Sequence, residues 1–196
     1  MGCPHPERES IARRLEACRD LLTSRRGVAF RNTSMSYANR EDLLTGEGSA
    51  RFAGRWNPEG IPTVYASVSL ETATAELQSH FRYYGVPLHH ATPRVLVAIE
   101  YDLSAVLDVT VGRTRQRLRF SRDRMTKEDW RAACRKGPET RTQSLGRSAF
   151  AAGIEGLLVP SAAHAGQGNL VVFPGNLRAS SRLSIYRGEL LPPGPM

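Results

Sequence analysis

The strongest strand signal in the chain is the run at 94–101, which reads Arg-Val-Leu-Val-Ala-Ile-Glu-Tyr. β-Branched and large apolar residues of this kind favour extended backbone. Further runs of similar character are expected to form strands at 27–31, 62–67, 105–109, 156–160, 169–173 and 183–187. The helical stripes between them are too few and too scattered for the strand–helix alternation of a doubly wound sheet. The sequence therefore predicts an α+β fold with a mixed, mostly antiparallel central sheet and flanking helices.

Two longer segments carry helical periodicity. The first, at 8–24, places apolar residues at steps of three and four: Ile11, Leu15, Cys18 and Leu22. We expect Gly27 to end this helix. Ser69 is a suitable N-cap for the second helix, which is expected at 70–84. Shorter helices are expected around 127–135 and 148–152.

A chain of 196 residues fits one domain with a substantial core. We expect an N-terminal helical arm at 1–26, a main domain at 27–188 and a disordered tail at 189–196. Within the main domain, 113–145 is a basic segment that looks like an insertion. No run approaches the ~18 consecutive apolar residues of a membrane helix, and the first residues lack the apolar stretch of a secretion signal. A cytoplasmic location without membrane contact is therefore expected.

The formal net charge of +8 indicates an anionic partner. That partner could be nucleic acid, a polyanionic small molecule or an acidic protein, and composition alone does not separate these classes. The three cysteines and five histidines show no spacing typical of a disulfide framework or a metal site. We therefore expect no metal.

The stretch at 32–60 shows no clear hydrophobic period and is expected to be irregular. The residue types best suited to chemistry lie at 46–76, which overlaps the end of this stretch. An arginine such as Arg55 can grip a diphosphate with two parallel hydrogen bonds. Trp56 and Tyr65 offer flat faces to a heteroaromatic ring. Each residue also has a plainer interpretation: Arg55 and Trp56 as a surface stacking pair, Tyr65 as a core aromatic, and Glu76 as a solvated helix residue.

Five motifs in a fixed order distinguish the chain from a generic basic domain. They are Gly54-Arg-Trp-Asn-x-x-Gly60, a strand ending in Tyr65-Ala-Ser67, Ser69-x-Glu-Thr-Ala-x-Ala-Glu76, Gly156-Leu-Leu-Val-Pro-Ser161 and Asn169-Leu-Val-Val-Phe173. This order and spacing resemble the RES-domain toxins of bacterial toxin–antitoxin pairs, from about Phe30 to Pro174.

The resemblance implies an ADP-ribosyltransferase-like fold and an enzyme whose substrate is NAD. Such an enzyme cleaves the nicotinamide–ribose bond and transfers ADP-ribose to water, phosphate or a protein. The resemblance also implies an antitoxin partner that carries a helix-turn-helix domain and covers the active site.

Matching the motifs residue by residue places the family's functional groups on this chain. The resemblance implies a catalytic group of Glu76, Arg55 and Tyr65. It implies NAD-binding residues at Arg31, Arg55, Tyr65, Ser161 and, more weakly, Asn169, and the flat ring of Trp56 adds a further NAD-binding candidate. The chemistry agrees, because a cation-like ribose needs a nearby negative charge and the substrate's phosphates need fixed cations.

The basic stretch at 113–136 permits other interpretations. Four arginines alternate with other residues, which predicts one strand face carrying Arg113, Arg115, Arg117 and Arg119. This face could receive an acidic partner, such as an antitoxin tail, or it could be an ordinary solvated surface. The alternative function is a basic nucleic-acid-binding module without catalysis. A third interpretation is a metal-free nuclease or transferase that uses Glu76 and His80.

Overall fold

The computed structural model describes residues 4–91 and 93–191. Its strands are β1 (Leu22–Ser34), β2 (Val64–Ser67), β3 (Arg94–Asp108), β4 (Gly156–Pro160), β5 (Gly168–Val172) and β6 (Arg182–Ile185). They form one sheet in the order β1-β2-β5-β4-β3-β6, and β1 also pairs with β3. The sheet therefore curls into a barrel-like ring instead of remaining an open central layer. Among the strand pairings of the described residues, β3–β4 alone is parallel, so the expected α+β class and mixed, mostly antiparallel sheet are confirmed.

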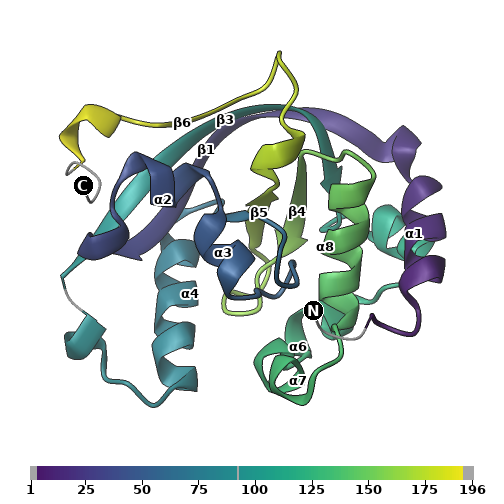
Figure 1. The fold of residues 1–196 in the computed structure, drawn as a ribbon, viewed down its shortest axis with the longest axis horizontal. Coiled ribbons are helices and arrows are strands. Elements are labelled where there is room, and N and C mark those ends of the chain that lie inside the picture. The colour runs from purple at the N-terminus through teal and green to yellow at the C-terminus, as the bar shows by residue number, and fades with distance from the viewer. Residues whose placement is uncertain (1–3, 92, 192–196) are drawn as a thin grey trace.

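Strands β1 and β3 form a long antiparallel arch across the top of the molecule (Figure 1). Their register runs from Leu22 opposite Leu107 to Ser34 opposite Arg94. The separate strands expected at 94–101 and 105–109 are thus one continuous strand. The helix expected at 8–24 is too long, because α1 (Arg8–Glu16) ends early and β1 begins at Leu22. Gly27 lies inside β1, so the prediction that it ends a helix is wrong.

The remaining helices are α2 (Arg40–Leu44), α3 (Glu47–Arg51), α4 (Leu70–Tyr83), α5 (Gly112–Leu118), α6 (Arg122–Lys127), α7 (Trp130–Lys136) and α8 (Arg141–Ala151). The hydroxyl of Ser69 accepts a hydrogen bond from the Thr72 amide, which confirms the predicted N-cap of α4. The stretch at 32–60 is more ordered than expected, since it carries the end of β1 and the helices α2 and α3. The short helix expected at 148–152 is the end of α8.

The arginines of the basic stretch do not share a strand face, which corrects the prediction made for them. Residues 112–118 form helix α5, and Thr114 and Leu118 are its buried residues. Side chains two positions apart on a helix point about 200° apart, so alternation spreads them around the axis. Arg117 instead binds Asp20 and the Ala17 carbonyl, which ties α5 to the end of α1.

Apolar side chains from the two faces of the sheet form two clusters. Helices α1, α5 and α8 cover one face of the sheet. Their side chains Ile11, Leu15, Leu118 and Leu145 pack with the sheet residues Leu157, Val159 and Val171 and with Phe173, which follows β5. The second cluster contains Ala29, Leu43, Val64, Val97, Ile99, Leu170 and Val172. Successive residues of a strand point to opposite faces, so β5 contributes Val171 to the first cluster and its two neighbours to the second.

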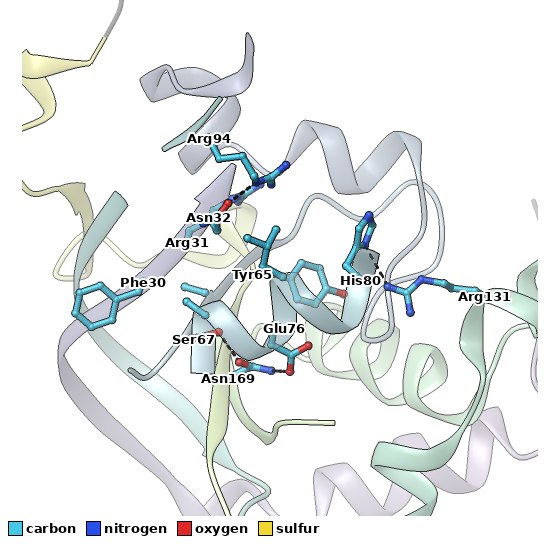
Figure 2. A pocket seen from close by; sticks show the side chains of 13 residues that line it. Phe30, Arg31, Asn32, Tyr65, Ser67, Glu76, His80, Arg94, Arg131 and Asn169 are labelled. Carbon is cyan, nitrogen blue, oxygen red and sulfur yellow. Dashed lines mark hydrogen bonds between the residues drawn. The ribbon is translucent and has the colours of Figure 1, made fainter. Parts of the chain in front are cut away.

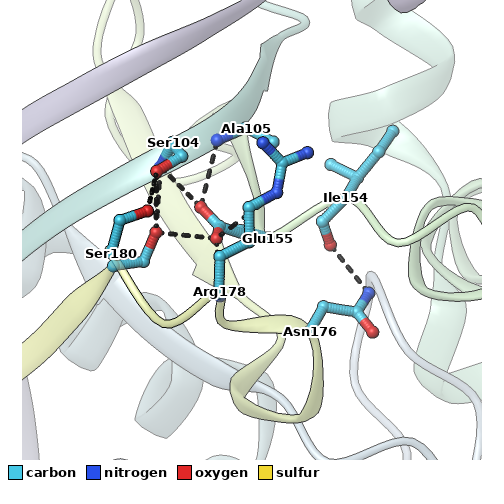
Figure 3. Close-up of polar contacts among 8 residues, drawn as sticks. Ser104, Ala105, Ile154, Glu155, Asn176, Arg178 and Ser180 are labelled. Carbon is cyan, nitrogen blue, oxygen red and sulfur yellow. Dashed lines mark hydrogen bonds and ion pairs between the residues drawn. The ribbon is translucent and has the colours of Figure 1, made fainter.

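A buried carboxylate joins β3, β4 and the chain before β6 (Figure 3). Oε2 of Glu155 accepts hydrogen bonds from the backbone amides of Ser104 and Ala105. Oε1 accepts from the Arg178 amide at 2.8 Å and the Ser181 hydroxyl at 2.7 Å. Burial alone would raise the pKa of Glu155, but these hydrogen bonds together lower it below the ordinary value.

Three features bear on the chain's ends and environment. Glu189 and Leu190 belong to a single 3₁₀ turn, while 192–196 of the expected tail, like Cys3, lie outside the described residues. Cys18 and Cys134 are free thiols. In the part of the chain that the structure describes, no helix is both long and apolar enough to cross a membrane.

Candidate active site

Glu76 projects from the middle of α4 and is held by residues from two strand ends. Its Oε1 accepts a hydrogen bond from the Ser161 hydroxyl at 2.6 Å and from the Asn169 amide nitrogen at 2.7 Å. The Asn169 amide oxygen in turn accepts from the Ser67 hydroxyl at 2.8 Å (Figure 2). Because this bond orients the Asn169 amide, its nitrogen faces the carboxylate.

Ser161 is oriented in the same way. Its oxygen accepts hydrogen bonds from the backbone amides of Ala163 and His164, so its proton is directed to Glu76. Both donors bind Oε1 of Glu76, whereas Oε2 has no hydrogen-bond partner among residues 4–91 and 93–191. The carboxylate is therefore fixed by one oxygen and presents the other to whatever occupies the site.

Two adjoining pockets meet at Glu76. The first, of about 460 Å³, is lined by residues of β1, β2, α4 and β5, with Arg31 from β1, and by Arg94 at the start of β3. The second, of about 310 Å³, is lined by Arg55, Trp56 and residues of α3, α4 and α7. Both pockets share Tyr65, Glu76, His80, Arg131 and Asn169. A bipartite site with a carboxylate at the junction suits an elongated ligand cleaved near its middle.

Each pocket carries a guanidinium anchored to backbone carbonyls. Arg31 donates from Nη1 to the Leu43 carbonyl at 3.2 Å. Arg55 donates from Nη1 to the carbonyls of Met125 and Glu128, at 3.0 and 2.9 Å. These contacts fix the two cations in place, and an arginine keeps its charge even when partly buried.

The Arg55 guanidinium also senses the charges across the second pocket. Burial lowers its pKa most strongly, the negative charge of Glu76 raises it, and the positive charge of Arg131 lowers it again. Among the described residues that line the second pocket, Arg55 and Arg131 are permanent cations and Glu76 is the one carboxylate. The local excess of positive charge favours an anionic ligand.

Tyr65 is fixed by its own hydroxyl. The hydroxyl accepts from the Trp56 amide at 2.9 Å and donates to Oδ1 of Asn57 at 2.7 Å, and burial raises its pKa. Gly54 is required for this approach, because a Cβ atom there would lie 2.5 Å from the Tyr65 hydroxyl oxygen. Trp56 is only 2% exposed and packs mainly in the core, with part of it lining the second pocket.

The structure thus gathers the residues that the motifs singled out. Arg31, Arg55, Trp56, Tyr65, Glu76 and Asn169 line the adjoining pockets. Ser161 lies behind Glu76, where its hydroxyl contacts the carboxylate.

Among the described residues that line the first pocket, three more have ionisable side chains, and the motif analysis did not single them out as NAD-binding groups. They are His80, Arg94 and Arg131. Burial lowers the pKa of His80, and the positive charges of Arg131 and Arg94 lower it further. The sequence contained no signal that separates Arg131 from the other cations of the basic stretch, because its selection depends on how α7 packs beside α4.

A family model, the RES domain, matches residues 29–190. The chain belongs to the RES-domain family. Among curated relatives, proteins named NAD(+) phosphorylase MbcT from Mycobacterium bovis and Mycobacterium tuberculosis are 27% identical to this RES-domain chain over 149 residues. The match covers 74% of this chain and 75% of theirs.

The fold of this RES-domain protein is similar to one seen in a solved complex. A crystal structure of the Mycobacterium tuberculosis MbcT–MbcA toxin–antitoxin complex contains a chain that superposes with a TM-score of 0.70. The two chains are 24% identical, and the superposition covers 91% of this chain and 90% of the other. Among the described residues, no group of three or more His, Cys, Asp and Glu side chains is arranged to hold a metal ion.

Proposed function

We propose that this RES-domain protein cleaves the nicotinamide–ribose bond of NAD and acts as the toxin of a bacterial toxin–antitoxin pair. The observation that carries the proposal is the position of Glu76, held by Ser161 and Asn169 at the junction of two pockets that each contain a partly buried arginine. The relatives named NAD(+) phosphorylase support the same substrate.

The site offers what this reaction demands. Nicotinamide in NAD is already a cationic leaving group, so bond cleavage needs no general acid. It does need negative charge beside the ribose as positive charge develops there. The free oxygen of Glu76 provides that charge, and Arg31 and Arg55 hold the phosphates so that the ribose faces it.

The other residues orient the substrate. Tyr65 lies between the pockets and packs against nicotinamide or its ribose, with part of Trp56 beside it. Ser161 and Asn169 act mainly by positioning Glu76, and Asn169 also lines both pockets. The ADP-ribose unit is transferred to water, phosphate or a protein acceptor on a scaffold of the ADP-ribosyltransferase type, in the cytoplasm and without a metal.

The proposed antitoxin carries a helix-turn-helix domain and blocks the two pockets until it is removed. The crystal structure of the MbcT–MbcA toxin–antitoxin complex supports an antitoxin partner. The cations at 113–136 that remain exposed, such as Arg113 and Arg122, suit an acidic segment of that partner.

The decisive experiment incubates the purified protein with NAD in metal-free buffer, with and without phosphate, and separates the products by chromatography. We expect stoichiometric nicotinamide release together with ADP-ribose or its 1″-phosphate. Intact NAD under both conditions would refute the proposal. Nucleic-acid binding that falls steeply with salt, without nicotinamide release, would instead support a binding module.

A further inference from the structure

Among the described residues, no backbone carbonyl and no carboxylate binds Arg131, a cation of the site. It lines both pockets, and its only hydrogen bond to a described residue is from Nη2 to Nδ1 of His80, at 3.4 Å. Its Nε is buried and has no partner in the described part of the chain. By contrast, Nη1 of Arg31 and Nη1 of Arg55 each donate to backbone carbonyls.

Aromatic rings and not carboxylates hold the Arg131 guanidinium. Its central carbon lies 4.5 Å from the Trp130 ring centroid and 4.7 Å from that of Tyr83. Within the described ranges, Arg131 forms no ion pair. Ring faces orient a guanidinium without neutralising it, so its charge and its edge donors remain available to an anion.

Arg131 also lies across the site from the other cations of the first pocket. In Figure 2, Arg31 and Arg94 lie on one side of Tyr65. His80 and Arg131 lie on the opposite side, and Glu76 lies below. The dinucleotide proposed to contact Arg31 and Arg55 spans both pockets, and Arg131 adds a further cation for a separate anion on the Arg55 side of Glu76. Phosphorolysis requires this arrangement, since two anionic substrates must bind together.

We propose that Arg131 binds the orthophosphate that accepts ADP-ribose, and so directs the enzyme to phosphorolysis instead of hydrolysis. This inference rests on the proposed cleavage of NAD. The C1″–N bond breaks and its electron pair returns to the pyridinium nitrogen, which leaves neutral nicotinamide. A lone pair of hydrogenphosphate forms the new C1″–O bond, and the phosphate's remaining proton passes to solvent. His80, which accepts from Arg131, fixes the orientation of the guanidinium.

The first test compares the wild type with Arg131→Gln and with Arg135→Gln as the matched control. Arg135 is an exposed residue of the same helix whose Nη2 donates to the Tyr83 hydroxyl, and it lines neither pocket. Initial rates are measured over a range of phosphate concentrations at fixed NAD, and then over a range of NAD at fixed phosphate.

Loss of the charged contact in Arg131→Gln is expected to raise the KM for phosphate roughly ten- to hundredfold. The products are expected to shift from ADP-ribose 1″-phosphate toward ADP-ribose, while the KM for NAD changes by less than about threefold. Arg131→Lys, which keeps the charge but not the fork, is expected to fall between the two. An unchanged phosphate KM and product ratio, or a parallel rise in both KM values, would overturn the proposal.

A second measurement does not depend on turnover. Orthophosphate is titrated into each protein without NAD, and binding is followed by calorimetry and ³¹P line width. Binding that is lost in Arg131→Gln and kept in Arg135→Gln supports the site, and equal binding by all three proteins contradicts it. If the wild type yields only ADP-ribose at every phosphate concentration, this inference is overturned but the proposed function is not. Absence of nicotinamide release under every condition overturns both.

Discussion

The Ser161 hydroxyl lies 2.6 Å from Oε1 of Glu76, so the residue that follows β4 positions a carboxylate presented by α4. These residues are 85 positions apart in the sequence. The contact forms because β4 ends and β5 begins beside the middle of α4, where Asn169 reaches the same oxygen. Because two hydrogen bonds hold Oε1, the carboxylate keeps one position although the Glu76 side chain is flexible.

Replacement of Glu76 by Gln tests the charge without removing the framework. The Gln side-chain oxygen can still accept from Ser161 and Asn169, so NAD affinity is expected to change by less than about threefold, while kcat falls about 10²- to 10³-fold. Nicotinamide release and equilibrium NAD binding check this. Glu71→Gln, at an exposed position of the same helix, is the control and is expected to behave as wild type. Retained turnover in Glu76→Gln would remove this residue from the mechanism.

Replacement of Ser161 by Ala tests the positioning of that charge. One of the two donors to Oε1 is lost, and the Asn169 contact remains. We expect kcat to fall about tenfold with little change in the KM for NAD, the cost of one hydrogen bond to a charged group. Ser184→Ala removes a serine–glutamate contact far along the sheet, to Glu100, and is the matched control. Equal effects of the two variants would show that the Ser161 contact has no special role.

Replacement of Gly54 by Ala tests the packing beneath Tyr65. A Cβ atom would lie 2.5 Å from the Tyr65 hydroxyl oxygen and 2.7 Å from Oδ1 of Asn57, so one of these groups must move. We expect the free energy of unfolding to fall by about 1–3 kcal/mol, as in other overpacked sites, with a loss of nicotinamide release. Gly48→Ala, inside α3 with open space around it, is expected to be neutral or to stabilise by up to about 1 kcal/mol. Urea unfolding of both variants provides the comparison.

Replacement of Arg55 by Lys tests the forked contact with phosphate. An ammonium cannot hold the Met125 and Glu128 carbonyls and also offer a planar edge to the ligand. The KM for NAD is therefore expected to rise about tenfold or more, with a smaller change in kcat. Arg51→Lys, at the exposed end of α3, should leave both values unchanged. Wild-type NAD affinity with Lys at position 55 would show that this arginine is not a phosphate clamp.

The parts of the structure that could be predicted are those determined by local chemistry. Ser69 caps α4 because its side chain competes for a free amide at a helix start, and this pattern is readable from a few residues. The strand at 156–160 is equally local, since a short apolar run between glycine and proline has few alternatives. The motif around Gly54 was recognised through its resemblance to a family, and the structure gives the physical reason for the glycine, because a Cβ atom there would clash with Tyr65.

The parts that were missed depend on distant pairing. Leu22 fits a helical stripe, but its pairing opposite Leu107 determines its conformation. The alternating arginines after Arg113 resemble a strand until Thr114 and Leu118 are buried on one helical face. The phosphate-facing side of Arg131 is defined only when α7 lies beside α4, which no local pattern encodes.

The final prediction concerns Glu155, whose carboxylate accepts hydrogen bonds from three backbone amides and the Ser181 hydroxyl. Its pKa in the folded protein is lowered from the ordinary value of 4.5. The stabilisation from the charged form is therefore fully present above pH 4.5 and is lost as the pH falls through the lower, folded value. In Glu155→Gln, an amide nitrogen replaces one acceptor and faces donors, so the variant is expected to be less stable at pH 7 by about 1.5–3 kcal/mol.

Urea unfolding between pH 7 and pH 3 is expected to show that this difference in stability shrinks in acid. Glu100→Gln, at an exposed position of β3, is the control and is expected to show no comparable difference at pH 7. A difference between the wild type and Glu155→Gln that stays constant across the pH range would mean that packing, and not the charge of Glu155, joins these strands.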